Sequence, residues 1–214
     1  MKDLNWAKNE VYYSSERPEM IDFLPKNAKK VLEVGCGNGN FGLRLKQMGC
    51  EIWGVEMEPE KAENASKHLS KVLQGNIMDL LDSLPDNYFD AIYFNDVIEH
   101  IYDPWKLLKD IKVKLEKENG VIISSIPNIR YFRFLFKFLF KQEWYYEDQG
   151  ILDITHIRFF TYKTIIQLFE STGYNIVYQQ GMFKTKSLPP RLLNVLFLGK
   201  FKDSFYPHFV TIAR

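Results

Sequence analysis

The pattern D-x-x-E-H, formed by Asp96, Glu99 and His100, brings two carboxyls and an imidazole together directly after an apolar run. A further histidine, His156, lies in the segment DITHIRFFT. An imidazole accepts a proton near neutral pH, as no other unperturbed side chain does, so His100 is the first candidate for a general base and His156 the second. The same four side chains could instead hold a divalent metal, although the adjacent Glu99 and His100 converge only across a turn. In a third interpretation, His100 only caps or packs a loop and His156 bonds a backbone carbonyl.

A glycine-rich turn interrupts the sequence VLEVGCGNGNFG, residues 31–42. Gly35, Gly37 and Gly39 alternate there, and glycine tolerates positive φ and lets a ligand approach the backbone amides. The spacing is G-x-G-x-G and not the G-x-G-x-x-G of dinucleotide-binding folds, and Glu33 stands in the strand before it. We therefore expect these three glycines and Glu33 to bind a ligand other than NAD. The alternative is a plain turn between a strand and a helix.

Polar side chains also gather where three further predicted strands end. Glu56 follows the glycine turn by about twenty residues, where related α/β sites place a ribose-binding carboxylate. Asn76 and Asn95 come at the ends of the next two strands, and Met57 and Ile77 are direct neighbours of Glu56 and Asn76. Open α/β sheets bind ligands at the carboxyl edge of their strands. We expect all five residues to contact the same ligand.

The elements that must position these residues alternate between strand and helix patterns from residue 29 onward. This alternation predicts parallel strands joined by helical crossovers, and therefore an α/β fold. Asp103 and Pro104 are the cap and first residue of one predicted helix, and another begins near Thr161. Strands are expected at residues 121–126, 175–179 and 208–213, and Pro189-Pro190 is expected in a loop.

The ordered motifs VLEVGCGNGNFG, GVEMEP, GNIMD, FDAIYFNDVIEH and GVIISSIPN resemble those of class I S-adenosylmethionine-dependent methyltransferases, over residues 29–128. The resemblance implies a Rossmann-like fold with a mostly parallel sheet flanked by helices. It also implies S-adenosylmethionine as cofactor and S-adenosylhomocysteine as product. Asn76 stands where the family usually has an Asp that binds the adenine amino group, and its carbonyl can still accept that bond. Arg17, on a short predicted helix ending at Pro25, is either a clamp for the methionine carboxylate or an ordinary surface residue.

The segment DITHIRFFT is similar to one found in methyltransferases of sugar and polysaccharide gene clusters and, more distantly, in ubiquinone-type O-methyltransferases. This similarity implies O-methylation of a sugar or polysaccharide precursor. The alternatives are a quinone-like or lipid-linked acceptor, or a non-catalytic module that only binds the cofactor. A comparable E-x-x-E-H with a later His is a metal site in small-RNA 3′-end methyltransferases, so a divalent metal stays open, ranked below a histidine base.

Composition limits the remaining possibilities. The chain has 214 residues with 28 basic and 27 acidic side chains, so no overall field favours nucleic acid, and the expected partner is a small-molecule or glycan acceptor. One domain over residues 1–214, with an inserted lid at about 128–160, fits this length. Two cysteines form no disulfide framework, and the first residues lack the apolar run of a signal peptide, so a cytoplasmic protein is expected.

The stretch from Arg130 to Lys141 is both very aromatic and basic. Arg130, Arg133, Lys137 and Lys141 recur every three or four residues, which predicts one basic face on an amphipathic helix. A structural helix with a solvated basic stripe is one interpretation. The other is a lid over the acceptor site that also touches a membrane surface. Ubiquinone-type enzymes carry a membrane-touching insertion at this place, so the resemblance implies the second interpretation.

Overall fold

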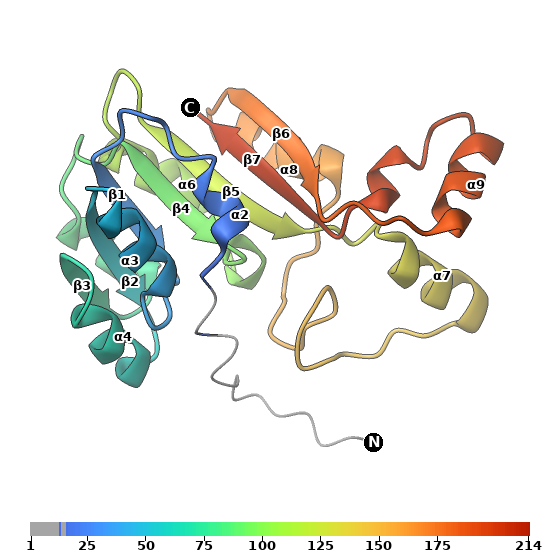
Figure 1. The fold of residues 1–214 in the computed structure, drawn as a ribbon, viewed down its shortest axis with the longest axis horizontal. Helices are drawn as coiled ribbons and strands as arrows, with labels where there is room; N and C mark the ends of the chain where they lie inside the picture. Colours follow the sequence, from blue (N-terminus) through green and yellow to red (C-terminus); the bar gives the residue numbers. More distant parts are fainter. Residues whose placement is uncertain (1–12, 14–15) are drawn as a thin grey trace.

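A computed structural model describes residue 13 and residues 16–214, and its centre is a seven-stranded sheet (Figure 1). The strands lie in the order β3-β2-β1-β4-β5-β7-β6, and β7 alone runs antiparallel to its neighbours β5 and β6. The strands are β1 Lys30–Val34, β2 Glu51–Glu56, β3 Lys71–Gln74, β4 Ala91–Asn95, β5 Val121–Pro127, β6 Ile176–Met182 and β7 His208–Ala213. The expected mostly parallel α/β sheet is confirmed.

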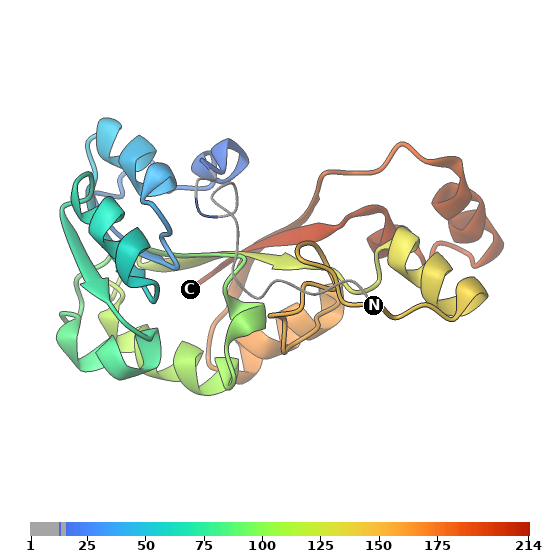
Figure 2. The same cartoon turned by 90° about the horizontal axis from the view of Figure 1, so that it is seen from below.

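Helices cover both faces of this sheet (Figure 2). The α-helices are α2 Pro18–Ile21, α3 Asn40–Gln47, α4 Pro59–Ser66, α5 Ile77–Leu80, α6 Pro104–Ile111, α7 Phe132–Lys141, α8 Tyr162–Ser171 and α9 Leu188–Leu196. The described residues also form four short 3-10 helices: η1 Leu81–Ser83, η2 Ile98–His100, η3 Lys112–Lys114 and η4 Lys202–Phe205. The crossovers place α2 and α3 on one face and α6 and α8 on the other.

Alternation along the central strands divides the core into two layers. On β4, Ile92 and Phe94 pack with the apolar residues of α6 and α8, whereas Ala91 and Tyr93 pack with those of α2 and α3. Successive side chains of a strand point to opposite faces, so a strand covered on both sides must be apolar throughout. All four of these side chains are fully buried, which explains why the sequence of β4 reads as one apolar run.

Two helix starts follow the expected capping chemistry. Asp103 accepts a hydrogen bond from Lys106 N at 2.9 Å, and Pro104 occupies the first turn of α6. Thr161 and Thr164 form a reciprocal capping box at the start of α8. Each cap satisfies backbone N–H groups that have no partner inside the helix.

The structure corrects three expectations. Pro189 and Pro190 lie in the first turn of α9 and not in a loop, because a first-turn proline loses no helical hydrogen bond. Arg17 precedes α2 in a left-handed conformation with φ 43°, and α2 ends at Ile21 and not at Pro25. Arg130 lies outside α7, so it does not share the helical face of Arg133.

The predicted insertion leaves and rejoins the sheet at one point, because Ile129 N donates to Phe160 O at 2.9 Å. Between these residues the chain forms α7 and an irregular segment, and α7 lies with α9 at the end of the molecule beyond β5 and β7 (Figure 1). Within the part of the chain that the structure describes, no helix combines the length and hydrophobicity needed to cross a bilayer.

Candidate active site

The glycine turn after β1 has the strained geometry that the sequence predicts. Gly35, Gly37 and Gly39 have φ values of 71°, 53° and 81°. A Cβ on Gly35 would lie 2.6 Å from Val97 Cγ2, and one on Gly37 would lie 2.8 Å from the carbonyl oxygen of Tyr13. Both positions therefore exclude any side chain, for reasons of conformation and of space.

Glu56 joins the end of β2 to this turn. Its carboxylate accepts hydrogen bonds from the backbone N–H groups of Gly37 and Met57, each at 2.8 Å, and of Glu58 at 3.0 Å. Bonds from backbone amides to a carboxylate are charge-assisted and hold the acceptor in a fixed orientation. The carboxylate is thus fixed beside the glycine turn, where a ribose-binding acid was expected.

A cavity of about 590 Å³ opens next to these residues, a size suited to a small-molecule ligand. Several residues expected at the ligand line it, together with the first candidate base: Gly35, Glu56, Met57, Asn76, Ile77 and His100. The side chain of Asn76 also caps α5, accepting a bond from Met78 N at 2.9 Å. Gly37, Gly39, Glu33, Asn95, Arg17 and His156 are not part of this lining.

Glu33 is buried inside the sheet, behind the glycine turn. Burial raises the pKa of its carboxyl to about 8, and a hydrogen bond from Gly42 N–H acts in the opposite direction. The side chain of Asn95 and the charge of Arg17 also lower this pKa, but burial outweighs them, so the neutral acid is favoured. Glu33 therefore lies next to the glycine turn, as expected, but it is buried beneath the turn and does not line the cavity.

Arg17 does not stand alone on the surface. Its guanidinium forms an ion pair with Asp96, which has φ 55° at the end of β4, and donates to Ser125 Oγ on β5 at 2.9 Å. Burial would raise the pKa of the Asp96 carboxyl, but the charges of Arg17 and His208 outweigh it and hold that pKa below its usual value. The Arg17 guanidinium therefore lies at the carboxyl edge of the sheet, with an acid as its partner.

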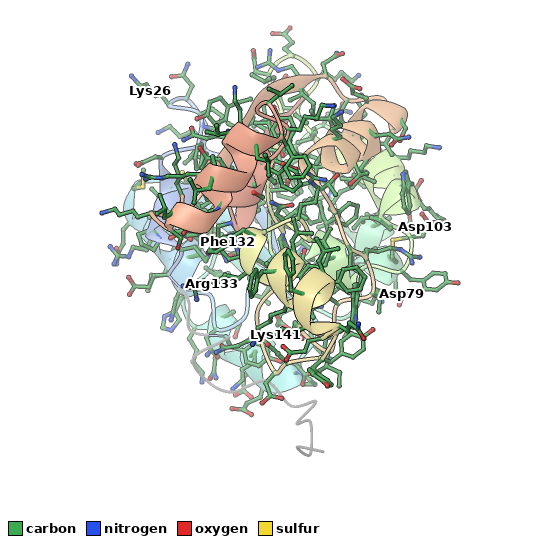
Figure 3. The ribbon with its side chains drawn as sticks, turned by 90° about the vertical axis from the view of Figure 1, so that its right-hand side faces the viewer. Lys26, Asp79, Asp103, Phe132, Arg133 and Lys141 are labelled. Atoms are coloured by element: carbon green, nitrogen blue, oxygen red, sulfur yellow. The ribbon has the colours of Figure 1, made fainter. Side chains whose placement is uncertain are left out.

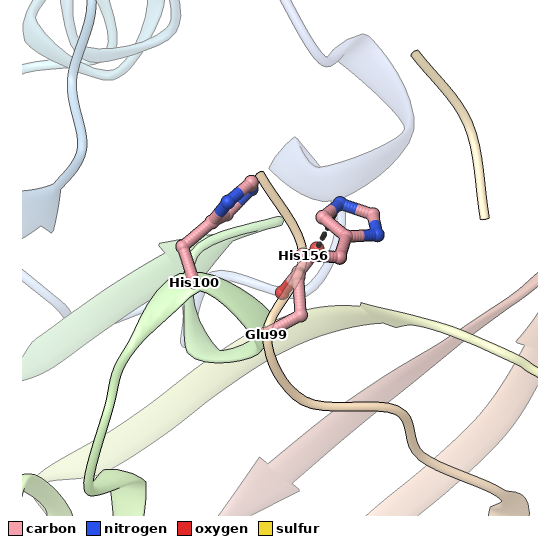
Figure 4. Close-up of side chains that lie close together, drawn as sticks. All are labelled: Glu99, His100 and His156. Atoms are coloured by element: carbon pink, nitrogen blue, oxygen red, sulfur yellow. Dashed lines mark ion pairs between the residues drawn. The ribbon is translucent and has the colours of Figure 1, made fainter. Parts of the chain in front are cut away.

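Glu99, His100 and His156 meet at the end of η2 (Figure 4). Ile157 and Arg158 both donate their N–H groups to the carbonyl of Glu99 at 3.0 Å, which docks the DITHIRFFT segment on η2. The two imidazole centroids lie 4.7 Å apart, and His156 Nε2 is 3.8 Å from Glu99 Oε1.

The orientation of both imidazoles is set by backbone carbonyls. His100 Nδ1 lies 3.1 Å from the carbonyl oxygen of Thr155, and His156 Nδ1 lies 3.0 Å from that of Ile151. A carbonyl can only accept, so each Nδ1 carries a proton, and in the neutral form of each imidazole Nε2 has the lone pair. The bond of His156 to a backbone carbonyl agrees with the third interpretation of the sequence, in which this histidine has a structural partner.

Glu99 is the unusual member of this cluster. Its side chain is 1 % exposed, and neither carboxylate oxygen accepts a hydrogen bond from the described residues. Burial raises the pKa of Glu99 well above its usual value, and the negative charge of Asp96 raises it further. Buried polar atoms normally have partners, so a carboxylate of this kind points to a missing proton or cation.

The residues present fit a divalent cation in part. The ligand atoms of Glu99, His100 and His156 lie within 4.8 Å of one another, and two ligands of one cation at about 2.1 Å are at most about 4.2 Å apart. The three side chains would therefore have to move together by only about half an ångström to bind one cation. Nδ1 bonds to carbonyls are also typical of metal-binding histidines. Asp96, expected as a fourth ligand, is instead engaged by Arg17 and Ser125.

The sheet order, the glycine turn and the acid at the end of β2 define a Rossmann-like class I methyltransferase fold. Residues 6–179 match the family model described as a methyltransferase domain. The chain belongs to this methyltransferase domain family, and the expected enzyme class is confirmed.

Solved structures agree on the fold. An S-adenosylmethionine-dependent methyltransferase of Archaeoglobus fulgidus superposes with a TM-score of 0.65 at 21% identity, covering 88% of this chain and 86% of that one. A possible histamine N-methyltransferase of Thermotoga maritima gives 0.62 at 24% identity, covering 94% and 87%. Both names specify S-adenosylmethionine as methyl donor, in agreement with the expected cofactor.

Sequence relatives include an uncharacterized protein and an O-methyltransferase. An uncharacterized protein of Methanocaldococcus jannaschii is 28% identical over 178 residues, 83% of this chain and 79% of that protein. The ubiquinone biosynthesis O-methyltransferase of Actinobacillus pleuropneumoniae is 30% identical over 125 residues. This match covers 52% of the chain, which spans about half the length of that enzyme (53%).

Proposed function

We propose that this methyltransferase moves the methyl group of S-adenosylmethionine to a hydroxyl oxygen, with His100 as general base. The observation that carries the proposal is the position of His100, which lines the same cavity as Gly35 and Glu56. Its Nδ1 is bound to the carbonyl of Thr155, so Nε2 is the nitrogen that takes the hydroxyl proton. The oxygen then attacks the methyl carbon in line as the sulfur leaves with its electron pair. Methyl transfer needs little else beyond proximity and alignment.

His156 supports this base and does not replace it. It is buried behind His100, at 3.8 Å from Glu99, and it lies outside the cavity lining. The ligand atoms of Glu99, His100 and His156 lie within 4.8 Å of one another, so the charge state of Glu99 acts on both imidazoles. An ionised Glu99 would favour the imidazolium that forms when His100 takes up a proton, whereas the neutral acid that burial favours would not.

The acceptor we favour is a sugar hydroxyl of a polysaccharide precursor, supported by the similarity of DITHIRFFT, the segment that carries His156. The second candidate is a quinone-like or lipid-linked acceptor. It is favoured by the relationship to ubiquinone O-methyltransferases and by the exposed apolar side chains of α7 and α9. A module that binds the cofactor without transfer is the third possibility.

Transfer of an isotope-labelled methyl group separates these three. Purified protein is incubated with labelled S-adenosylmethionine and either nucleotide-activated sugars or quinols, and products are identified by mass spectrometry. His100→Ala should abolish transfer, whereas His68→Ala, at an exposed histidine, is the matched control and should retain it. Transfer that survives His100→Ala refutes the base, and cofactor binding without transfer to either acceptor class favours the third possibility.

A metal-dependent scheme is the competing mechanism for the same cluster. In it Glu99, His100 and His156 would hold a divalent cation that polarises the acceptor oxygen and lowers its pKa. Treatment with EDTA decides between the schemes, because a histidine base needs no metal. Loss of transfer that magnesium or manganese restores would assign these residues as ligands.

A further inference from the structure

Two stretches of the chain, residues 130–141 and 184–202, contain nine basic side chains and no acidic one. The net charge of the whole protein is +1, so all other residues together carry a net charge of −8. Within these stretches Arg130 and Lys137 are paired with acids that lie just outside them, Asp203 and Glu147. We call these two stretches the basic apolar surface.

The two stretches lie side by side in the fold, although 42 residues separate them in the sequence. Arg130 joins them, since its Nε lies 2.6 Å from Asp203 Oδ2 and its Nη2 donates to the carbonyl of Lys200 at 3.2 Å. Figure 3 looks at this end of the molecule and shows α7 beside α9, with Arg133 and Lys141 labelled on α7.

The same surface exposes large apolar side chains. On α7, Leu139 and Phe140 are 63% and 69% exposed, and only Phe134 of this helix is buried. On α9 and the turn after it, Leu196 and Leu198 are 73% and 89% exposed. Soluble monomers seldom gather exposed apolar side chains in this number on one patch, so the surface has a binding role.

We propose that the basic apolar surface binds the headgroup region of an anionic lipid bilayer. Apolar side chains on short helices, surrounded by lysine and arginine, are the features by which proteins lie in a bilayer interface. A nucleic acid or an acidic protein would pair with the basic residues but leave Phe140, Leu196 and Leu198 in water. This inference holds whichever acceptor is methylated.

The surface is directly connected to the candidate active site. Helix α7 ends at Lys141, and the segment that follows it, up to residue 160, contains His156. His156 Nε2 lies 3.8 Å from Glu99 Oε1 in the candidate active site. Aromatic contacts hold this connection, since Trp144 packs on Phe134 of α7 at 5.1 Å and on Phe159 at 5.6 Å between ring centroids. A membrane that binds α7 therefore contacts the same insertion that forms one wall of the histidine cluster.

Cosedimentation with vesicles tests the proposal on the full chain. Vesicles of phosphatidylcholine alone are compared with vesicles of phosphatidylcholine and phosphatidylglycerol, at low and high salt. We expect binding to the anionic vesicles only, and loss of most of it in 1 M salt, where the screening length falls to about 3 Å. Arg133→Gln with Arg191→Gln should weaken binding by about fivefold per residue. The control pair Lys109→Gln and Lys117→Gln, exposed but outside the surface, should leave it unchanged.

The apolar contribution is tested separately. Phe140→Ser with Leu196→Ser should reduce binding at least tenfold, whereas Met48→Ser with Val177→Ser, at residues 56% and 59% exposed elsewhere, should not. Melting curves confirm that each variant is folded. Equal binding to neutral and anionic vesicles, or no binding to either, overturns the proposal. The proposal is also overturned if the wild type is a dimer, does not bind vesicles, and is made monomeric by Phe140→Ser with Leu196→Ser. A second copy of the chain would then cover this surface.

Discussion

Replacement of Glu33 by Gln should make the protein more stable at alkaline pH, although it removes an ionisable residue from behind the glycine turn. The side chain of Glu33 is buried, and its pKa is raised to about 8 by that burial. Gln has nearly the same shape as the neutral acid and cannot ionise. The variant therefore keeps the form that the folded protein prefers.

The sign and size of the effect follow from proton linkage. In an unfolded chain the carboxyl titrates near 4.5, so below this pH both states are protonated and Glu33 causes no loss of stability. Between pH 4.5 and 8 the unfolded state releases its proton and the folded state retains it, so the stability of the wild type falls as pH rises. A pKa of about 8 against 4.5 corresponds to a loss of about 5 kcal/mol above pH 8.

Urea unfolding at several pH values between 4 and 9 measures this difference. The free energy of unfolding of Glu33→Gln minus that of the wild type should increase with pH and level off above pH 8. Subtraction removes the contributions of other groups such as Glu99, whose pKa is also raised. Glu63→Gln, at an exposed position, is the control and should give a flat difference. A flat difference for Glu33→Gln would refute the buried neutral acid.

Three further variants test the site and the insertion. Glu56→Ala should weaken S-adenosylmethionine binding on the order of 10- to 100-fold for each ribose hydrogen bond lost, and an unchanged Kd in calorimetry would place the ribose elsewhere. Gly35→Ala should cost about 1 to 3 kcal/mol in urea unfolding, because its Cβ would lie 2.6 Å from Val97 Cγ2, and Val97→Ala in the same chain should recover part of the loss. Arg133→Gln with Lys137→Gln should leave Tm nearly unchanged, since exposed charges contribute about 0 to 1 kcal/mol, and a large fall in Tm would show that α7 depends on them.

The fold was largely predictable because its strands and helices carry strong periodic patterns and ordinary caps. Asp103 with Pro104 marks the start of α6 through local chemistry alone. The start of α9 was missed for the opposite reason, since Pro189-Pro190 is equally compatible with a loop and with a first helical turn. Only tertiary packing, such as that of α9 on η4, distinguishes the two, and such packing cannot be recognised from local sequence.

The site was predictable where it depends on the ends of strands. Glu56 and Asn76 lie on the cavity because parallel strands bring their carboxyl ends to one edge. Two partners of Arg17 were not predictable, because Asp96 and Ser125 are 79 and 108 residues away in the sequence, whereas its ion pair with Glu19 is local. The role of Arg17 as a clamp for the methionine carboxylate remains a prediction, and a ligand carboxylate there would compete with Asp96.

Glu33 also provides a test of whether the cofactor binds where the fold places it. S-adenosylmethionine carries positive charge, so if it binds near Glu33 it favours the ionised carboxylate and must displace a proton below pH 8. Wild-type affinity, measured by calorimetry, should then rise with pH up to about 8, by as much as tenfold per pH unit. In Glu33→Gln this rise should disappear, while titration of the cofactor itself affects both proteins equally. The same pH dependence in both proteins would show that the bound cation lies too far from Glu33 to interact with it.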